Sequence, residues 1–149
     1  MLLRLTKRFA FEMAHALPAY QGKCRNIHGH SYKLYVTVEG EPSLVEGSPD
    51  GMIVDFGSIK EIVQHHIIDH FDHALVLPRQ PDLHTASDTQ LGGFAAKIIW
   101  VDFVPTTERL LLHFAHLLDH TFPPGTRLYS LKLYETENSC AELILGNWV

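Results

Sequence analysis

The stretch from His28 to Glu39, HGHSYKLYVTVE, predicts a β-strand with one buried face and one solvated face. Apolar and polar side chains alternate along it, and alternate residues of an extended chain point to opposite sides. The apolar side carries Tyr32, Leu34, Val36 and Val38. Counting back in steps of two places His28 and His30 on this same side, so the two imidazoles point in one direction.

The preceding segment, Leu3–Met13, predicts a second strand with the same alternation. Its apolar residues are Leu3, Leu5, Phe9, Phe11 and Met13, with Lys7 as the exception among the odd positions. If the strand continues, His15 projects on the same side as Phe11 and Met13. Residues 18–27 then predict a loop, because they contain proline, glycine and asparagine.

The rest of the chain predicts two amphipathic helices and several shorter strands. The first helix is expected to open at Ser58, which would form a capping box with Glu61, and to end near residues 71–73. The second is expected to begin within residues 105–108, where Thr106 and Thr107 are the candidate caps. The expected strands are 52–55, 98–104, 128–136 and 141–145, and the expected loops are 40–50 and 78–94.

This order of elements indicates an α+β fold in a single domain that covers residues 1–149. We expect an antiparallel four-stranded sheet with two helices on one face. Such a sheet has two edges that must be covered or paired, which favours a homo-oligomer.

The composition is that of a globular protein, with 46% hydrophobic and 19% charged residues in a chain of 149. The net charge of −5 argues against nucleic acid as a partner, because phosphate backbones require a basic surface. No apolar stretch is long enough to cross a membrane, and the N-terminus does not resemble a signal peptide. We therefore expect a cytoplasmic protein whose two cysteines, Cys24 and Cys140, are reduced.

Three histidines, His15, His28 and His30, are predicted to hold one metal ion. Three neutral imidazole nitrogens suit Zn²⁺ and leave its fourth position open, which is typical of catalytic zinc sites. A histidine can also fill space and hydrogen-bond in a core. We interpret the remaining helical histidines as residues that flank the apolar helix faces: His65, His66, His70, His113, His116 and His120.

Further residues could carry chemistry beside such a metal. Cys24 lies between a lysine and an arginine, and these cations together with a nearby Zn²⁺ favour a thiolate that acts as base, nucleophile or fourth ligand. His73 follows Asp72, but adjacent residues rarely hydrogen-bond each other in a strand, so we expect another acid to orient His73. Glu135 is the obvious candidate, because it shares the apolar side of its strand, where a carboxylate without a role is costly. The alternative is that Glu135 has reached solvent at the strand end.

Six segments with this chemistry follow one another along nearly the whole chain. They are FEMAHAL (11–17), CRNIHGHSY (24–32), MIVDF (52–56), FDHAL (71–75), PTTE (105–108) and YET (134–136). Together they resemble the family of 6-pyruvoyltetrahydropterin and 6-carboxytetrahydropterin synthases. Six ordered motifs are far more specific than a pair of histidines alone.

The resemblance implies the tunnelling fold, in which subunits join their sheets into a barrel and active sites lie between the subunits of a tetramer or hexamer. It implies Zn²⁺ on the same three histidines. It also implies that Cys24 is the general base and that His73, with Asp72 beside it, relays a proton.

The resemblance further implies a pterin triphosphate, 7,8-dihydroneopterin triphosphate, as the substrate. Glu135 is similar to the acid that grips the pterin ring or takes part in the relay. Thr106, Thr107 and Glu108 resemble a segment that lines the pterin pocket. The stretch 78–104 is longer than in the shortest family members, which affects the rim of the pocket more than the chemistry.

The three residues between Cys24 and His28 resemble the spacing in the bacterial branch that acts in queuosine (7-deazaguanine) biosynthesis. That branch releases acetaldehyde and triphosphate and leaves 6-carboxytetrahydropterin. The alternatives are the pyruvoyl branch and a non-catalytic zinc-binding module. A cupin-type oxygenase also places two histidines on one strand, but it requires a glutamate a few residues later, where this chain has Leu34.

Overall fold

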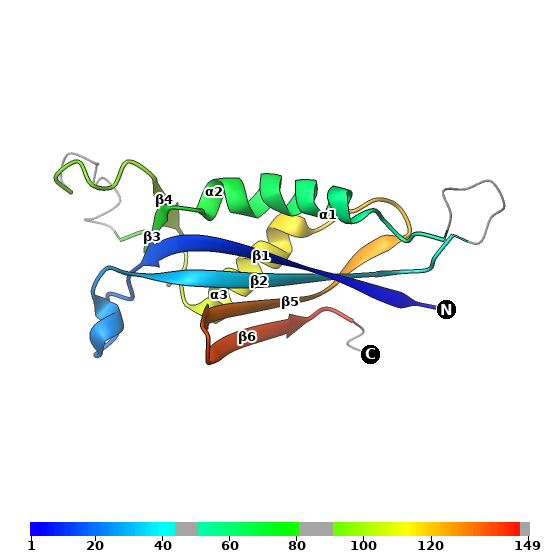
Figure 1. Ribbon diagram of the computed structural model, residues 1–149. Helices are drawn as coiled ribbons and strands as arrows, with labels where there is room; N and C mark the ends of the chain where they lie inside the picture. The colour runs from blue at the N-terminus through cyan, green and yellow to red at the C-terminus, as the bar shows by residue number, and fades with distance from the viewer. Residues whose placement is uncertain (44–50, 81–90, 147–149) are drawn as a thin grey trace.

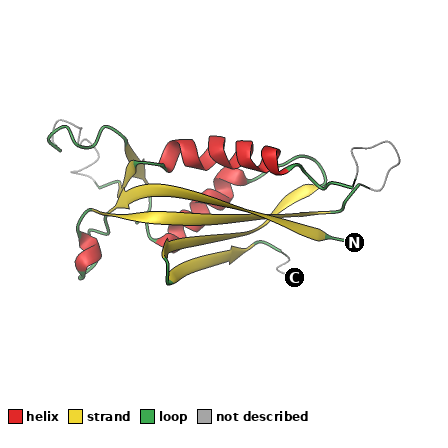
Figure 2. Ribbon diagram, in the orientation of Figure 1, coloured by secondary structure: helices red, strands yellow, loops and turns green. Residues whose placement is uncertain are grey.

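The computed structural model describes residues 1–43, 51–80 and 91–146. A long twisted sheet runs the length of the molecule, and two helical segments pack against it (Figures 1 and 2). The sheet has six strands in the order β4-β3-β1-β2-β5-β6. Their bounds are β1 Leu3–His15, β2 His28–Gly40, β3 Ala74–Pro78, β4 Ile98–Val101, β5 Thr126–Thr136 and β6 Ser139–Ile144.

The expected α+β fold is confirmed, and so are its four antiparallel strands, β1, β2, β5 and β6. The sheet is larger than expected because β3 joins β1 in parallel and β4 joins β3 in parallel. The sequence did not predict β3, whose residues ALVLP form a short, mostly buried apolar run without alternation. Periodicity does not distinguish such a run from the end of a buried helix.

Both helical segments lie on the same face of the sheet, as expected. The first consists of α1 (Phe56–Val63), a π-helical turn η2 (Gln64–Ile68) and α2 (Asp69–Phe71), and the second is α3 (Thr107–Leu118). Ile59, Val63 and Ile67 from the first and Leu110, Phe114 and Leu118 from the second are buried. They pack in one core with the apolar side of the sheet, including Phe11, Leu34 and Leu131.

Two local predictions were wrong. Residues 52–55 form no strand, because their backbone groups bond elsewhere: Ser43 N donates to Met52 O, and the Thr126 hydroxyl donates to Ile53 O. The first helix begins at Phe56 with Asp55 as N-cap, so Ser58 lies in its first turn and forms no capping box. Of the expected loops, residues 44–50 and 81–90 lie outside the described residues.

The sheet presents backbone edges that no described residue pairs. The outer edge of β6 is one, and the part of β1 from Leu3 to Phe11 is another, since β3 pairs only with residues 13–15 of β1 and residues 72 and 73 bond the backbone of Glu12. Unpaired edges of this length are normally covered or paired with another chain. No helix in the described ranges is long and apolar enough to span a membrane.

We predict that the apolar face of α3 carries much of the fold's stability. Leu118 is 0% exposed and Leu112, on the same helix, is 51% exposed. Leu118→Ala is expected to lower the free energy of unfolding by about 2–5 kcal/mol, because it leaves a cavity in the core. The matched control Leu112→Ala should change it by less than about 1 kcal/mol. Urea denaturation measures both, and equal effects would contradict the placement of Leu118 in the core.

Candidate metal centre

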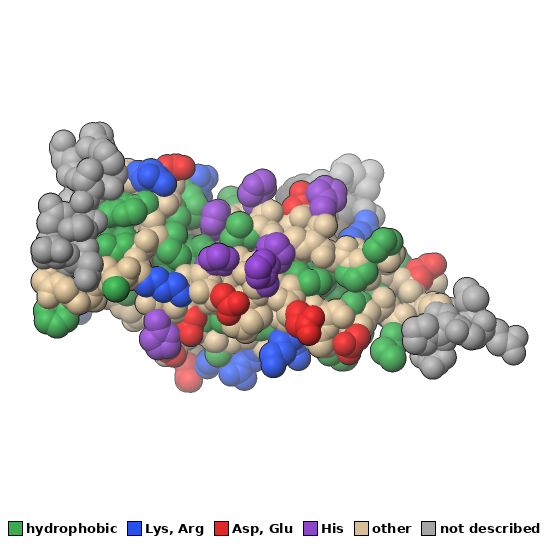
Figure 3. Space-filling view, turned by 90° about the horizontal axis from the view of Figure 1, so that it is seen from above, with side chains coloured by type: hydrophobic (Ala, Val, Ile, Leu, Met, Phe, Trp, Pro, Cys, Tyr) green, Lys and Arg blue, Asp and Glu red, His purple; other side chains and the backbone are tan. Residues whose placement is uncertain are grey.

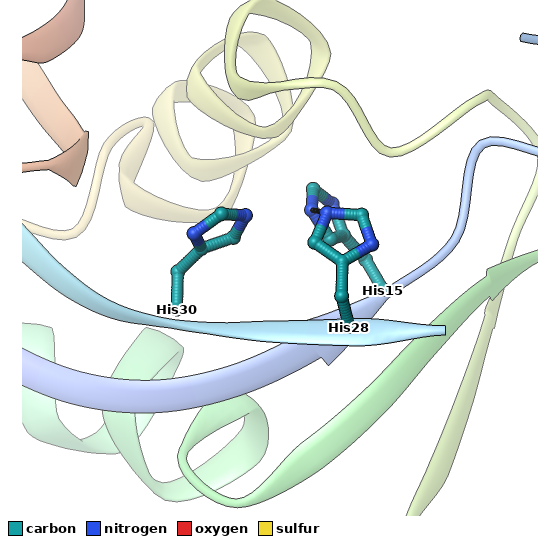
Figure 4. Close-up of side chains that lie close together, drawn as sticks. All are labelled: His15, His28 and His30. Atoms are coloured by element: carbon teal, nitrogen blue, oxygen red, sulfur yellow. Dashed lines mark hydrogen bonds between the residues drawn. The ribbon is translucent and has the colours of Figure 1, made fainter. Parts of the chain in front are cut away.

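Three imidazoles meet where β1 ends and β2 begins. The antiparallel register sets His15 opposite His28 and Met13 opposite His30. Figure 4 shows the three side chains rising from the two strands into one space. Their candidate ligand atoms all lie within 4.8 Å of one another, and His15 is completely buried. The structure therefore brings together the three histidines that the strand pattern selected.

Hydrogen bonds to backbone carbonyls fix the orientation of two of these rings. His15 Nδ1 lies 2.8 Å from Pro105 O, and His28 Nδ1 lies 2.7 Å from Asn26 O. A carbonyl oxygen can only accept, so each Nδ1 must carry the hydrogen and donate it. In the neutral rings each Nε2 then presents a lone pair, which is the form that ligates a metal.

The lone pairs of these rings face one another without a donor between them. His15 Nε2 and His28 Nε2 are 3.1 Å apart, and His30 Nε2 is buried with no hydrogen-bond partner. Two nitrogen ligands at about 2.0–2.1 Å from a tetrahedral Zn²⁺ are about 3.3 Å apart. The donor set and its spacing therefore fit a divalent metal ion.

Burial favours the neutral form of His15 and of His30. Loss of solvent lowers the pKa of His15 and of His30, because the protonated imidazole is poorly solvated in the interior. The carboxylate of Glu135 acts in the opposite direction on the pKa of both rings, since its Oε1 lies 3.5 Å from each Nε2. Because burial is the larger cause, the nitrogens are available to a metal at neutral pH.

Glu135 lies between the metal centre and a small cavity at the N-terminal end of α3. The cavity, of about 160 Å³, is lined by Thr107, Glu108 and Glu135 together with residues 139–141 at the start of β6. Thr106 does not line it. As expected from the sequence, Thr106 caps α3, where its hydroxyl accepts a hydrogen bond from Arg109 N.

Cys24 lies in the short helix η1 (Lys23–Arg25), in the loop between β1 and β2, and is half-buried with a free thiol. Leu17 N donates to Cys24 O over 2.9 Å, which closes the loop back toward β1. Cys24 also lies within electrostatic reach of the Tyr32 hydroxyl. Burial, with smaller contributions from Glu135 and Cys24, raises the pKa of that hydroxyl. The ring of Tyr32 packs against those of His15 and His30, so Tyr32 is the described residue that links Cys24 to the metal centre.

Asp72 and His73 form an ion pair with each other, in contrast to the expectation that another acid would orient His73. His73 Nδ1 lies 3.0 Å from Asp72 Oδ1. The expectation failed because His73 is not extended: its φ of +60° turns the ring back toward Asp72. The backbone N–H of Glu12, which donates to Asp72 Oδ1, is the main cause that lowers the pKa of Asp72.

The Asp72–His73 pair belongs to a different cavity from the one beside Glu135. His73 lines a hollow of about 420 Å³ together with Glu12 and Ser31, whose side chains are hydrogen-bonded to each other, and His30 of the metal centre also borders it. By strand alternation, these two side chains project from the face opposite the three histidines. Among the described residues, no hydrogen bond or ion pair joins His73 to Cys24 or to the metal centre.

Within the described ranges, the other histidines form no part of this cluster. His65, His70, His116 and His120 are exposed. Figure 3 views the molecule from above α1 and shows histidine side chains gathered on that surface. In the described ranges, only His15, His28 and His30 bring three candidate ligand atoms together.

Sequence reasoning missed the groups that orient the site. The carbonyls of Pro105 and Asn26 fix the two rings, and the backbone N–H of Glu12 holds Asp72. Backbone groups carry no side-chain signature, so no pattern in the sequence could have identified them.

Comparisons with known proteins identify the family to which the chain is similar. Residues 4–144 match the family model described as 6-pyruvoyl tetrahydropterin synthase. The chain is 33% identical to the 6-carboxy-5,6,7,8-tetrahydropterin synthase of Haemophilus influenzae, covering 95% of this chain and 98% of the relative. It is 32% identical to the 6-pyruvoyl tetrahydrobiopterin synthase of Pongo abelii, covering 79% and 68%. The structure of the Caenorhabditis elegans 6-pyruvoyl tetrahydropterin synthase shares the fold, with a TM-score of 0.67, 22% identity and coverage of 97% and 96%.

We predict that each of the three clustered histidines is needed for metal binding. His28→Ala removes one of the nitrogens that face each other and should lower the bound Zn²⁺ well below one per chain, as measured by elemental analysis after reconstitution. His70→Ala, an exposed histidine outside the cluster, is the matched control and should keep full occupancy. Stoichiometric zinc in the His28 variant would remove that residue from the ligand set.

Proposed function

The chain belongs to the 6-pyruvoyl tetrahydropterin synthase family, and on this premise we propose that it is a zinc-dependent lyase of pterin triphosphates. The proposed reaction converts 7,8-dihydroneopterin triphosphate and water to 6-carboxytetrahydropterin, acetaldehyde and triphosphate, as a step of queuosine biosynthesis. The observation that carries the proposal is the set of three imidazoles whose Nε2 atoms converge beside Glu135. The similarity to the Haemophilus influenzae relative over 95% of the chain supports the carboxy product.

His15, His28 and His30 hold the metal in this proposal. When bound, Zn²⁺ supplies a Lewis acid that polarises and acidifies the hydroxyls of the substrate side chain. The carbonyls of Pro105 and Asn26 keep two of the rings in the tautomer that ligates. Because the rings are oriented before any ligand arrives, little reorganisation is needed on binding.

The cavity beside the metal centre is the proposed site of the pterin ring. Its two carboxylates, Glu108 and Glu135, are acceptors for the N–H groups on the edge of a pterin, and Thr107 adds a hydroxyl. At about 160 Å³ it is smaller than the roughly 300–1,000 Å³ of typical ligand pockets. We infer that it accommodates only part of the substrate within one chain.

Two groups move protons in this mechanism. The Cys24 thiolate removes a proton from the substrate side chain, and the electrostatic interaction of Cys24 with Tyr32, whose ring packs against His30, supports that role. His73 transfers a second proton through Nε2, since its Nδ1 is engaged by Asp72. The lowered pKa of Asp72 keeps that residue ionised at neutral pH, where it stabilises the imidazolium.

We further propose that one active site takes Cys24 and His73 from different subunits of a tetramer or hexamer. His73 is 77% exposed and lines a cavity with Glu12 and Ser31, whose side chains project from the face of β1 and β2 opposite the metal ligands, although His30 also borders this cavity. The unpaired edges of β1 and β6 offer backbone groups that a neighbouring copy can pair. A neighbour joined in this way brings its own Asp72–His73 pair toward the metal centre of this chain.

The test of the function is incubation of the zinc-loaded protein with 7,8-dihydroneopterin triphosphate, followed by mass identification of the pterin. We expect 6-carboxytetrahydropterin and an equal amount of acetaldehyde. The pyruvoyl pterin without acetaldehyde would assign the chain to the pyruvoyl branch, which the Pongo abelii relative represents. Bound zinc with no turnover would favour the non-catalytic zinc-binding module.

We predict that Cys24→Ala abolishes turnover and leaves the metal in place. General base catalysis contributes about 10²–10⁴-fold to a rate, so kcat should fall by about 100-fold or more. Zinc content should be that of the unaltered protein, because the three histidines remain. Leu112→Ala, at an exposed side chain that lines neither cavity, is the control and should keep full activity. Full activity of Cys24→Ala would end its assignment as the base.

We predict that inactive Cys24→Ala and His73→Ala chains complement each other when they assemble together. If each site combines Cys24 of one subunit with His73 of another, random mixing gives half times half, or about a quarter, of the sites both intact residues. Turnover of the co-expressed mixture, compared with each variant alone, measures this. A mixture as inactive as its components would show that both residues come from one chain.

A further inference from the structure

The backbone at His73 adopts an unfavourable conformation that the proposed relay depends on. Its φ of +60° lies in the left-handed region, which residues other than glycine rarely adopt. The conformation directs His73 N–H to Glu12 O over 2.6 Å and brings Nδ1 to 3.0 Å from Asp72 Oδ1. Any group that stabilises this turn therefore also sets the position of the imidazole.

The turn leaves a helix carbonyl without its usual partner. In a continuing helix, His73 N–H would bond to Asp69 O, four residues earlier. That N–H is instead taken by Glu12 on β1. Lys97 occupies the vacant acceptor: its Nζ donates to Asp69 O over 2.8 Å and to Asp72 O over 2.7 Å.

The backbone of Lys97 holds the other side of the turn. Leu75 N donates to Lys97 O over 2.9 Å, at the point where β3 meets β4. Lys97 thus bonds the residue before His73 through its side chain, and the second residue after His73 through its carbonyl.

We propose that Lys97 is a positioning residue that fixes the left-handed turn at His73, and through it the orientation of the Asp72–His73 pair. The inference rests on the proposed role of His73 in proton transfer. Lys97 acts through backbone carbonyls and touches no substrate. A lysine at the C-terminal end of a helix also interacts favourably with the helix dipole, which reinforces these bonds.

The test compares three variants of the full-length, zinc-loaded protein. Lys97→Met removes the two donated hydrogen bonds but keeps an unbranched chain, Lys97→Arg keeps a cation with several donors, and Lys60→Met is a control at an exposed lysine of α1. Because a displacement of about 1 Å costs up to about 100-fold in rate, we expect Lys97→Met to lower kcat by about 10–100-fold. KM should be unchanged, and Lys97→Arg should recover most of kcat.

A second readout does not depend on activity. Hydrogen exchange of the amides of His73 and Leu75, measured without substrate, should be faster in Lys97→Met than in the unaltered protein. Exchange at these amides in Lys97→Arg and in Lys60→Met should equal that of the unaltered protein. A structural role confined to overall stability would instead accelerate exchange throughout the sheet.

The outcomes separate this inference from the proposed function. An unaltered kcat in Lys97→Met, a loss that Lys97→Arg does not recover, or a loss through KM alone would overturn the role of Lys97. Absence of turnover in the unaltered protein would overturn the proposed function. The exchange measurement would then decide whether Lys97 still fixes the turn. If the amides of His73 and Leu75 in Lys97→Met exchange as in the unaltered protein, the role of Lys97 is overturned as well.

Discussion

The ladder between β1 and β2 pairs Leu3 with Gly40 at one end and His15 with His28 at the other, with no break between them. Register errors in such a ladder are severe, because a shift of one residue moves every side chain to the opposite face. A one-residue slip would expose Phe11 or Leu34 and would also remove His15 from the other two histidines. The burial of the core and the assembly of the metal centre are therefore secured by the same set of backbone hydrogen bonds.

This coupling explains why a costly site persists inside the sheet. Imidazoles with facing lone pairs, one of them fully buried, destabilise a chain that has nothing to bind them. Packing in the apolar core offsets this unfavourable free energy. Tyr32 is one of the residues involved, since its ring packs against both Phe11 and His30. A bound metal ion would convert the same arrangement from a repulsive contact into a set of ligands, which links metal binding to the stability of the strand ends.

The two faces of the sheet divide the chemistry. The metal ligands and Glu135 project toward the helices, whereas Glu12 and Ser31 project away from them and line the cavity of His73. In the assembly proposed above, a neighbouring copy paired along an open edge brings the two sets to one substrate. The strand β3 pairs only with the end of β1, so the rest of that edge of β1 stays open to a neighbouring copy. Lys97 holds the turn that precedes β3.

The sequence by itself determined the alternation of β1 and β2, the common direction of His15, His28 and His30, and the cap of α3 at Thr106, because each depends on neighbours within a few residues. It did not determine β3, the start of α1 or the partner of His73. These were decided by contacts between distant segments: β3 exists because it pairs with β1 and β4, and the ring of His73 turns to Asp72 because Glu12, sixty residues earlier, binds both. Local periodicity indicates which face of a helix or strand is buried. Only the tertiary structure decides which backbone N–H and C=O groups lack a partner within their own element, and which distant groups form hydrogen bonds with them.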